Sequence, residues 1–118
     1  MVENAGAVAN IFHTHFVQIE VQDGRAVVNP PGLLVNRFDT IQWICLEKDF
    51  VAYFENRSAT DRPVWSANQR VASPPATATG EVSDLPYGYV VEVITPGQPP
   101  IVIRDNPHVI ITAARIAG

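Results

Sequence analysis

The chain has 118 residues, of which 47% are hydrophobic and 17% charged, and its formal net charge is −4. This length predicts a single domain over residues 1–118, because two separate cores would each be too small. The apolar content excludes a disordered chain, and no apolar run approaches the ~20 residues of a membrane-spanning helix. The 10 prolines argue against a helical bundle, because proline interrupts helices.

The charge distribution, the cysteine content and the N-terminal residues limit which binding partners and which cellular compartment are expected. The basic residues are scattered singly, whereas a nucleic-acid partner usually requires a basic patch, so none is expected. With Cys45 as the only cysteine, neither an internal disulfide nor a thiolate zinc cluster can form. Residues 1–10 lack the basic start and long apolar stretch of a signal peptide. This favours the cytoplasm, although a mature secreted or periplasmic form would look the same.

The first predicted strand spans Phe12–Gln22, where polarity alternates with a period of two. One face of this strand holds His13, His15, Val17, Ile19 and Val21. Asp23-Gly24 follows as a turn signal. Further short strands are predicted at Arg25–Asn29, Leu33–Val35, Thr40–Leu46, Phe50–Glu55, Tyr89–Ile94, Ile101–Arg104 and His108–Ala113.

Residues 56–86 differ from the rest, since they are polar and rich in small residues, with Pro74-Pro75 in the middle. This composition predicts a long irregular connection with at most a short helical turn; such loops are often functional or disordered. The complete pattern predicts an all-β fold, a seven- to eight-stranded antiparallel Greek-key sandwich.

Several segments resemble the cupredoxin family. The resembling residues are Val28-Asn29-Pro30, Leu34-Val35, Phe38-Asp39-Thr40-Ile41-Gln42-Trp43, Phe50-Val51-Ala52-Tyr53-Phe54 and Tyr87-Gly88-Tyr89-Val90-Val91-Glu92-Val93. The resemblance covers roughly residues 24–113 and implies a cupredoxin-like sandwich. Phe38 stands where the family usually has glycine.

The copper ligands implied by this resemblance are not matched. A blue-copper centre needs two imidazoles and a thiolate, usually with a weak axial methionine. Phe50 stands at the position of the first histidine and Val93 at that of the cysteine, and residues 94–100 contain neither histidine nor methionine. A cupredoxin-like domain without a blue-copper site, and without any cofactor, is therefore expected.

The pair His13-x-His15 is the most specific local signal for chemistry. Alternate residues on a strand place both imidazoles on one face, where they can bind one divalent transition metal. His108 begins the last predicted strand and is the third candidate ligand. The alternative is that these histidines are structural residues at the end of a strand.

An alternative interpretation of the same residues is that the chain is a cupin-like metalloenzyme. His13-x-His15 followed by Glu20 resembles part of the first cupin motif, and Gly80 with Pro86-x-Gly88 resembles the opening of the second. Val91 stands where the second motif would continue with histidine, and strand alternation places Glu20 on the opposite face from the histidines. These departures make an enzyme less expected than a protein without catalytic activity.

Aromatic residues outside the predicted core suggest a partner surface. Trp65 lies in the polar connection, where it either plugs the end of the sandwich or forms an exposed anchor, and Tyr87 and Tyr89 are candidate companions. A non-catalytic binding or assembly module, acting on a protein partner or as a homo-oligomer, is the leading prediction. A third hypothesis is a small-ligand site near Phe50, Tyr53 and Trp65.

Overall fold

The structure is a computed structural model that describes residues 10–46, 48–61, 64–67, 73–104, 106–113 and 115–116. These residues form strands and turns, and they include no helix that could cross a membrane. The prediction about a signal peptide falls mostly on residues outside this description. The strands are β1 (Asn10–Ile11), β2 (Thr14–Gln22), β3 (Arg25–Asn29), β4 (Gly32–Asn36), β5 (Thr40–Ile44), β6 (Asp49–Phe54), β7 (Val64–Ala67), β8 (Ala76–Thr77), β9 (Ser83–Ile94), β10 (Ile101–Ile103), β11 (His108–Thr112) and β12 (Arg115–Ile116).

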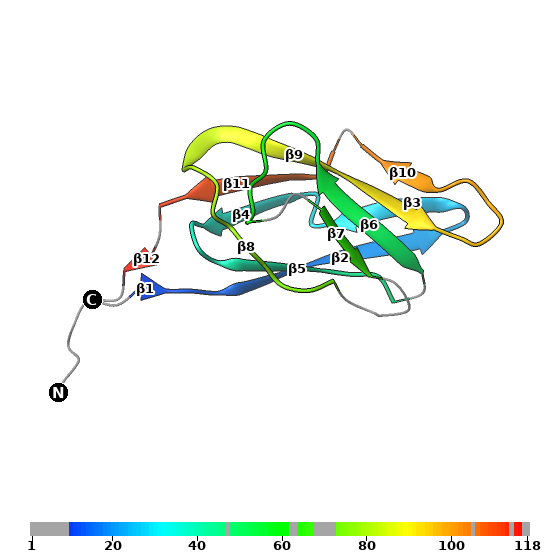
Figure 1. Ribbon diagram of the computed structural model, residues 1–118, viewed down its shortest axis with the longest axis horizontal. Helices are drawn as coiled ribbons and strands as arrows, with labels where there is room; N and C mark the ends of the chain where they lie inside the picture. Colours follow the sequence, from blue (N-terminus) through cyan, green and yellow to red (C-terminus); the bar gives the residue numbers. More distant parts are fainter. Residues whose placement is uncertain are drawn as a thin grey trace.

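Two sheets face each other, and a small ribbon joins the two ends of the described chain (Figure 1). The first sheet has the order β3-β2-β5-β8. The second has the order β4-β11-β9-β6-β7, and β10 pairs with the remaining part of β9. The ribbon consists of β1 and β12. Buried apolar side chains from both sheets form one cluster, so the prediction of an all-β sandwich is confirmed at this level.

Both sheets are mixed, which corrects the prediction of a purely antiparallel sandwich. β2 pairs in parallel with β5, and β4 pairs in parallel with β11. The chain leaves the first sheet after β3 and enters the second at β4, so strands that are distant in sequence become neighbours. Parallel pairs require such crossover connections. Alternation along one strand carries no information about the direction of its neighbour, so the sequence pattern missed these pairs.

The hairpin between β2 and β3 agrees with the sequence prediction. Asp23 and Gly24 have φ angles of 53° and 75°. Two consecutive residues with positive φ are typical of a type I′ turn, which suits the twist of a two-stranded hairpin. Val17 and Ile19 of β2 are buried, while their neighbours Phe16 and Gln18 are exposed. The period of two therefore marked the buried face correctly.

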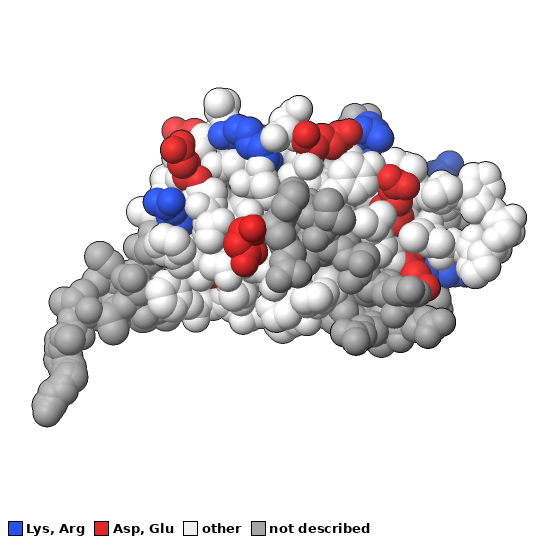
Figure 2. Space-filling view, viewed as in Figure 1, with Lys and Arg blue, Asp and Glu red and all other residues white. Residues whose placement is uncertain are grey.

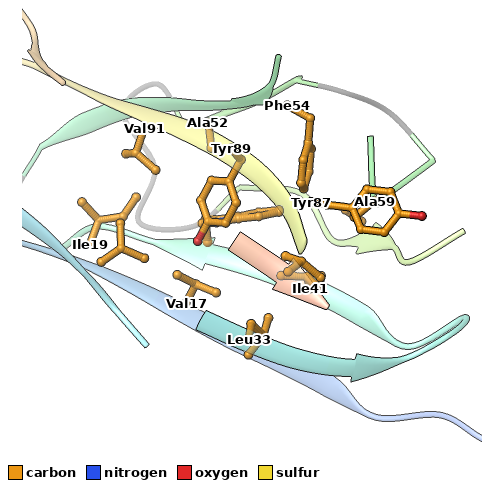
Figure 3. Close-up of a cluster of buried hydrophobic side chains, with 14 of the residues drawn as sticks. Val17, Ile19, Leu33, Ile41, Ala52, Phe54, Ala59, Tyr87, Tyr89 and Val91 are labelled. Carbon is orange, nitrogen blue, oxygen red and sulfur yellow. The ribbon is translucent and has the colours of Figure 1, made fainter. Parts of the chain in front are cut away.

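The centre of the core comes from β5, β6 and β9. As alternation predicted, β5 and the residue after it bury Ile41, Trp43 and Cys45, and β6 buries Phe50, Ala52 and Phe54. Figure 3 shows the Tyr89 side chain reaching from β9 toward Val17 of the opposite sheet. Its ring packs edge-on against Trp43, with centroids 5.5 Å apart and planes at 77°. Such a T-shaped pair adds a directional contact to the burial of two large rings.

The segment 56–86, predicted to be irregular, contains two strands and the start of β9, which corrects that prediction. β7 pairs with β6, and β8 pairs with β5. Ser73 is bonded to β5 as well, since its N–H donates to the Trp43 carbonyl at 2.9 Å and its hydroxyl accepts the Trp43 N–H at 3.1 Å. Short edge strands of this kind depend on tertiary contacts more than on local pattern. They help to raise the described strands to twelve, against the predicted seven or eight.

Gly80 lies where a side chain has no room. A Cβ at this position would lie 3.1 Å from the Cα and 3.2 Å from the carbonyl oxygen of Ala59, and 3.0 Å from the Cδ1 of Ile111. Because backbone atoms cannot turn aside, we expect Gly80→Ala to lower the free energy of unfolding by about 1–3 kcal/mol in urea denaturation. Gly88→Ala is the matched control, since a Cβ there meets no atom within 4 Å. Equal stability of the two variants would contradict the tight contact.

Candidate functional site

Asp39 joins β2 to the turn between β4 and β5. Its side chain is fully buried, and one carboxylate oxygen accepts the backbone N–H of His13 at 3.0 Å. The other oxygen accepts the backbone N–H of Asn36 at 3.0 Å and lies 2.7 Å from Nε2 of His15. A buried carboxylate is stable only when its oxygens are satisfied in this way. In the sequence, Asp39 belongs to the cupredoxin-like run Phe38-Asp39-Thr40-Ile41-Gln42-Trp43, and its burial was not predicted.

His13 and His15 are both held by Asp39, but in different ways. His15 faces inward at the start of β2 and contacts the carboxylate through its ring, whereas His13 precedes β2 and contacts it through its backbone. The carbonyl oxygen of His13 also accepts the Thr40 N–H at 2.9 Å. The imidazole–carboxylate pair therefore fixes the entry of β2 against β5. Among the described residues, the hydrogen-bond partner found for the His15 ring is the Asp39 carboxylate.

His108 lies away from the other two histidines. β4 and β11 run in parallel, with His108 opposite Gly32 at their start and Thr112 opposite Asn36 at their end. Asn36 is the residue that contacts Asp39, so four residues of strand, about 13 Å at ~3.3 Å per residue, separate His108 from that end. The His108 ring lies over Gly32, where a Cβ would be 2.6 Å from Nε2. The structure thus does not bring His108 to His13 and His15.

The described residues contain no group of three or more histidine, cysteine, aspartate or glutamate side chains placed to hold one metal ion. Glu20, part of the cupin-like pattern, alternates with His15 and faces the other side of β2. Val91, at the position of the second-motif histidine, is buried in the core. Metal binding by His13, His15 and His108 remains a prediction. Of the side chains that could bind a metal there, the described residues place one imidazole and one carboxylate together, those of His15 and Asp39.

The two positions that the cupredoxin resemblance assigns to copper ligands are direct neighbours. Phe50 at the start of β6 pairs with Val93 near the end of β9. Both side chains are buried, with exposures of 1% and 0%. A phenyl ring and an isopropyl group therefore occupy adjacent inward positions at this end of the sandwich, and neither can bind a metal ion.

The tyrosines predicted as a partner surface are buried. Tyr87 and Tyr89 are 3% and 1% exposed, which corrects the prediction that they form an exposed patch. Residues two apart on a strand share a face, and on β9 that face is the inner one (Figure 3). The Tyr87 hydroxyl donates to the Glu81 carbonyl at 2.6 Å, and the Arg57 guanidinium lies 4.0 Å above its ring. Trp65 lies on β7, but its side chain is outside the described part of the structure.

Tyr89 is the group whose ionisation the core perturbs most clearly. Burial raises the pKa of its phenol to about 12, and the neighbouring Trp43 indole acts in the opposite direction to a smaller extent. In the unfolded chain the Tyr89 phenol loses its proton near pH 10, whereas in the folded protein it keeps the proton to a higher pH. Below ~pH 10 the phenol is protonated in both states, so its ionisation does not lower the free energy of unfolding. Stability should then fall by about 1 kcal/mol per pH unit between ~10 and ~12.

The check is urea unfolding of the native protein and of Tyr89→Phe at several pH values in this window. We expect a steeper loss of stability with pH in the native protein, because the variant has no phenol at this position. Parallel pH profiles of the two proteins would contradict the assignment.

A groove of about 500 Å³ lies beside β2 at the point where β5 ends. Its walls are Gln18–Gln22 of β2 and Ile44–Leu46 at the end of β5. Cys45 is part of this lining, but its side chain is almost fully buried, in keeping with the prediction of a buried thiol. The small-ligand hypothesis placed the site elsewhere, near Phe50 and Tyr53. These two residues point to opposite faces of β6 and do not line one pocket.

A smaller, polar hollow of about 350 Å³ lies beside the end of β6 and contains Arg57 and Arg104. Arg104 is paired with Glu55 at 2.5 Å, and the Arg57 guanidinium donates to the carbonyls of Leu85 and Pro86. On the face shown in Figure 2, positive and negative side chains are interspersed among uncharged ones. That face therefore offers no continuous basic surface to a polyanion.

Comparisons with protein-family models, with curated proteins and with solved structures gave no match to this chain.

Proposed function

We propose that this chain is a non-catalytic, cupredoxin-like binding or assembly module that lacks a blue-copper site. The observation that carries the proposal is the buried pair of Phe50 and Val93. The resemblance assigns one position to a copper histidine and the other to the copper cysteine, and a shared ion would need them adjacent. They are adjacent across β6 and β9, yet both side chains are apolar.

The conformation of Phe38 supports the same family relationship. Cupredoxins usually have glycine at this point of the motif, and Phe38 has a φ of 77°. That is the left-handed region, which glycine adopts without strain and other residues rarely adopt. A backbone that retains the conformation of a glycine position, after the glycine itself has been replaced, is consistent with a cupredoxin-like ancestor.

The proposal is tested by metal content and molecular mass. Protein purified from its source cells without a histidine tag or chelator should contain no stoichiometric copper, and adding Cu(II) should produce no intense copper–thiolate absorption. The same preparation should be larger than a monomer or should co-purify with a partner. One tightly held copper ion per chain would refute the proposal, as would a monodisperse monomer at high concentration with no partner recovered from a lysate.

The rival metal hypothesis makes an opposite prediction. If His13 and His15 bind a divalent metal, the purified protein carries about one ion per chain, and either His13→Ala or His15→Ala removes it. The described residues provide His15 and Asp39 together but no third ligand. This arrangement favours a structural role for the pair.

A second candidate function is supported by the groove between β2 and β5. A volume of about 500 Å³ with mixed polar and apolar walls is within the range of small-molecule sites. A change in tryptophan fluorescence across a ligand panel, lost when Ile44 is replaced by aspartate, would favour small-ligand binding over assembly.

A further inference from the structure

β4 forms an edge of the second sheet. Along β4, the backbone N–H and carbonyl groups of successive residues point alternately toward β11 and toward the unpaired side of the strand. Among the described residues, β4 pairs only with β11. The Pro31 carbonyl accepts the His108 N–H at 2.9 Å, and the Arg37 N–H donates to the Thr112 carbonyl at 2.8 Å. In a parallel pair every second residue turns both peptide groups toward its neighbour. Residues 31, 33, 35 and 37 therefore face β11, and residues 32, 34 and 36 face the open side.

Two of these three outward-facing residues are free to bind another strand. The N–H of Asn36 donates to the Asp39 carboxylate at 3.0 Å, and its carbonyl accepts the Asp39 N–H at 3.0 Å. Gly32 and Leu34 have no comparable partner among the described residues. The open edge of β4 thus presents two N–H donors and two carbonyl acceptors.

Among the described residues, this short edge, which follows Pro30-Pro31, has neither the charges and bulges nor the covering loop that often prevent edge-to-edge pairing. Natural edge strands are protected by lysine, inward-pointing charges, bulges or covering loops. β4 has the sequence Gly-Leu-Leu-Val-Asn, with no charge and a regular register along β11. Leu34 at its centre is 63% exposed. An uncharged edge with an exposed leucine is a favourable template for a further strand.

We propose that a second copy of this chain adds to this edge, with the two β4 strands antiparallel about a two-fold axis and Gly32 opposite Leu34 of the partner. This inference rests on the proposed assembly function and names the partner. In a hydrogen-bonded antiparallel pair, two opposite residues exchange both of their bonds. The pairing occurs twice by symmetry, so the two donors and two acceptors of each chain are all satisfied.

Neighbouring registers satisfy fewer groups. A shift of two residues in one direction places Leu34 opposite Pro30, which has no N–H to donate. A shift of two residues in the other places Gly32 opposite Asn36, whose N–H is already bonded to Asp39. A shift of one residue turns the strand over, so that Leu34 no longer lies on the same face of both sheets. The proposed register is the one that uses every free group.

The side chains also fit this register. Leu34 would lie across from Gly32 of the partner, which has no side chain to obstruct it. The position of a Cβ on Gly32 is filled by the His108 ring of the same chain. Leu34 of one copy would therefore pack against the imidazole of the other, and Ile110, its neighbour on β11, would border the contact.

The test combines sedimentation equilibrium over a range of protein concentrations with amide hydrogen exchange followed by NMR. We expect a concentration-dependent dimer in which exchange at the Gly32 and Leu34 amides slows as the dimer forms. Leu34→Lys should weaken dimerisation by about ten-fold or more, since it places a charge on the edge. Leu85→Lys is the matched control, because Leu85 is a similarly exposed leucine on β9, and this change should leave the dimer unaffected.

The outcomes separate this interface from the proposed function. A dimer that persists in Leu34→Lys, with fast exchange at Gly32 and Leu34 in the native protein, overturns the β4 interface and leaves an assembly module with another contact surface. A monomer at every concentration overturns self-assembly, and a partner pull-down then decides whether the binding function survives. Exchange in the native protein decides the matter even if Leu34→Lys fails to fold.

Discussion

Replacing Asp39 with alanine should lower the free energy of unfolding by about 3–5 kcal/mol, because removing one partner of a buried charged contact leaves the others unsatisfied. The backbone N–H groups of His13 and Asn36 would both lose their acceptor. The His15 ring would lose its partner at 2.7 Å. The damage should spread to the start of β2 and to the β4–β5 turn, which share this carboxylate.

Urea denaturation at neutral pH measures this effect directly. Asp84→Ala is the control, because Asp84 is an exposed aspartate on β9 and its loss should change stability by less than about 0.5 kcal/mol. If Asp39→Ala were as stable as the control, Asp39 could not be the residue that holds these segments together.

Trp43→Ala should cost a similar amount, about 3–5 kcal/mol, through a different cause. The Trp43 side chain is fully buried and contacts the Tyr89 ring across the two sheets. Truncation removes its buried area and leaves a cavity that rigid strands on both sides cannot fill.

Circular dichroism in urea is the appropriate probe, since the variant loses the core fluorophore. Leu85→Ala serves as the control, because Leu85 is 68% exposed and contributes little buried surface. A midpoint for Trp43→Ala equal to that of the control would show that Trp43 is not central to the core.

The sequence predicted the inward faces of the strands well. Alternation identified Val17 and Ile19 on β2 and the buried residues of β5 and β6, because each strand covers a core with one face and meets solvent with the other. The Asp23-Gly24 turn was also found, since positive φ at two consecutive residues is a local property of the chain.

The sequence patterns did not predict features that depend on contacts between residues far apart in the chain. The parallel pairing of β2 with β5 depends on how the chain crosses between sheets, which no local pattern records. β7 and β8 lie in a polar, proline-rich segment and are strands because β6 and β5 offer open edges. Tyr87 and Tyr89 were expected on the surface; their spacing places both on one face of β9, and the packing of the two sheets makes that face the inner one.

The candidate site could be predicted only in part. The His13-x-His15 spacing indicated the start of β2 as a candidate site. The buried Asp39 carboxylate, which contacts both histidines there, is 24 residues away from His15 in the sequence. An aspartate immediately before a strand usually faces solvent, so only the tertiary structure could distinguish Asp39 from a loop residue. The separation of His108 likewise follows from the parallel register of β4 and β11.

Native mass spectrometry of protein purified without a histidine tag or chelator tests the central claim most directly, because one spectrum reports both bound metal and the number of chains. A metal-free dimer is the predicted result. A monomer that carries one copper or other transition-metal ion per chain would contradict the account and would move the function to His13 and His15.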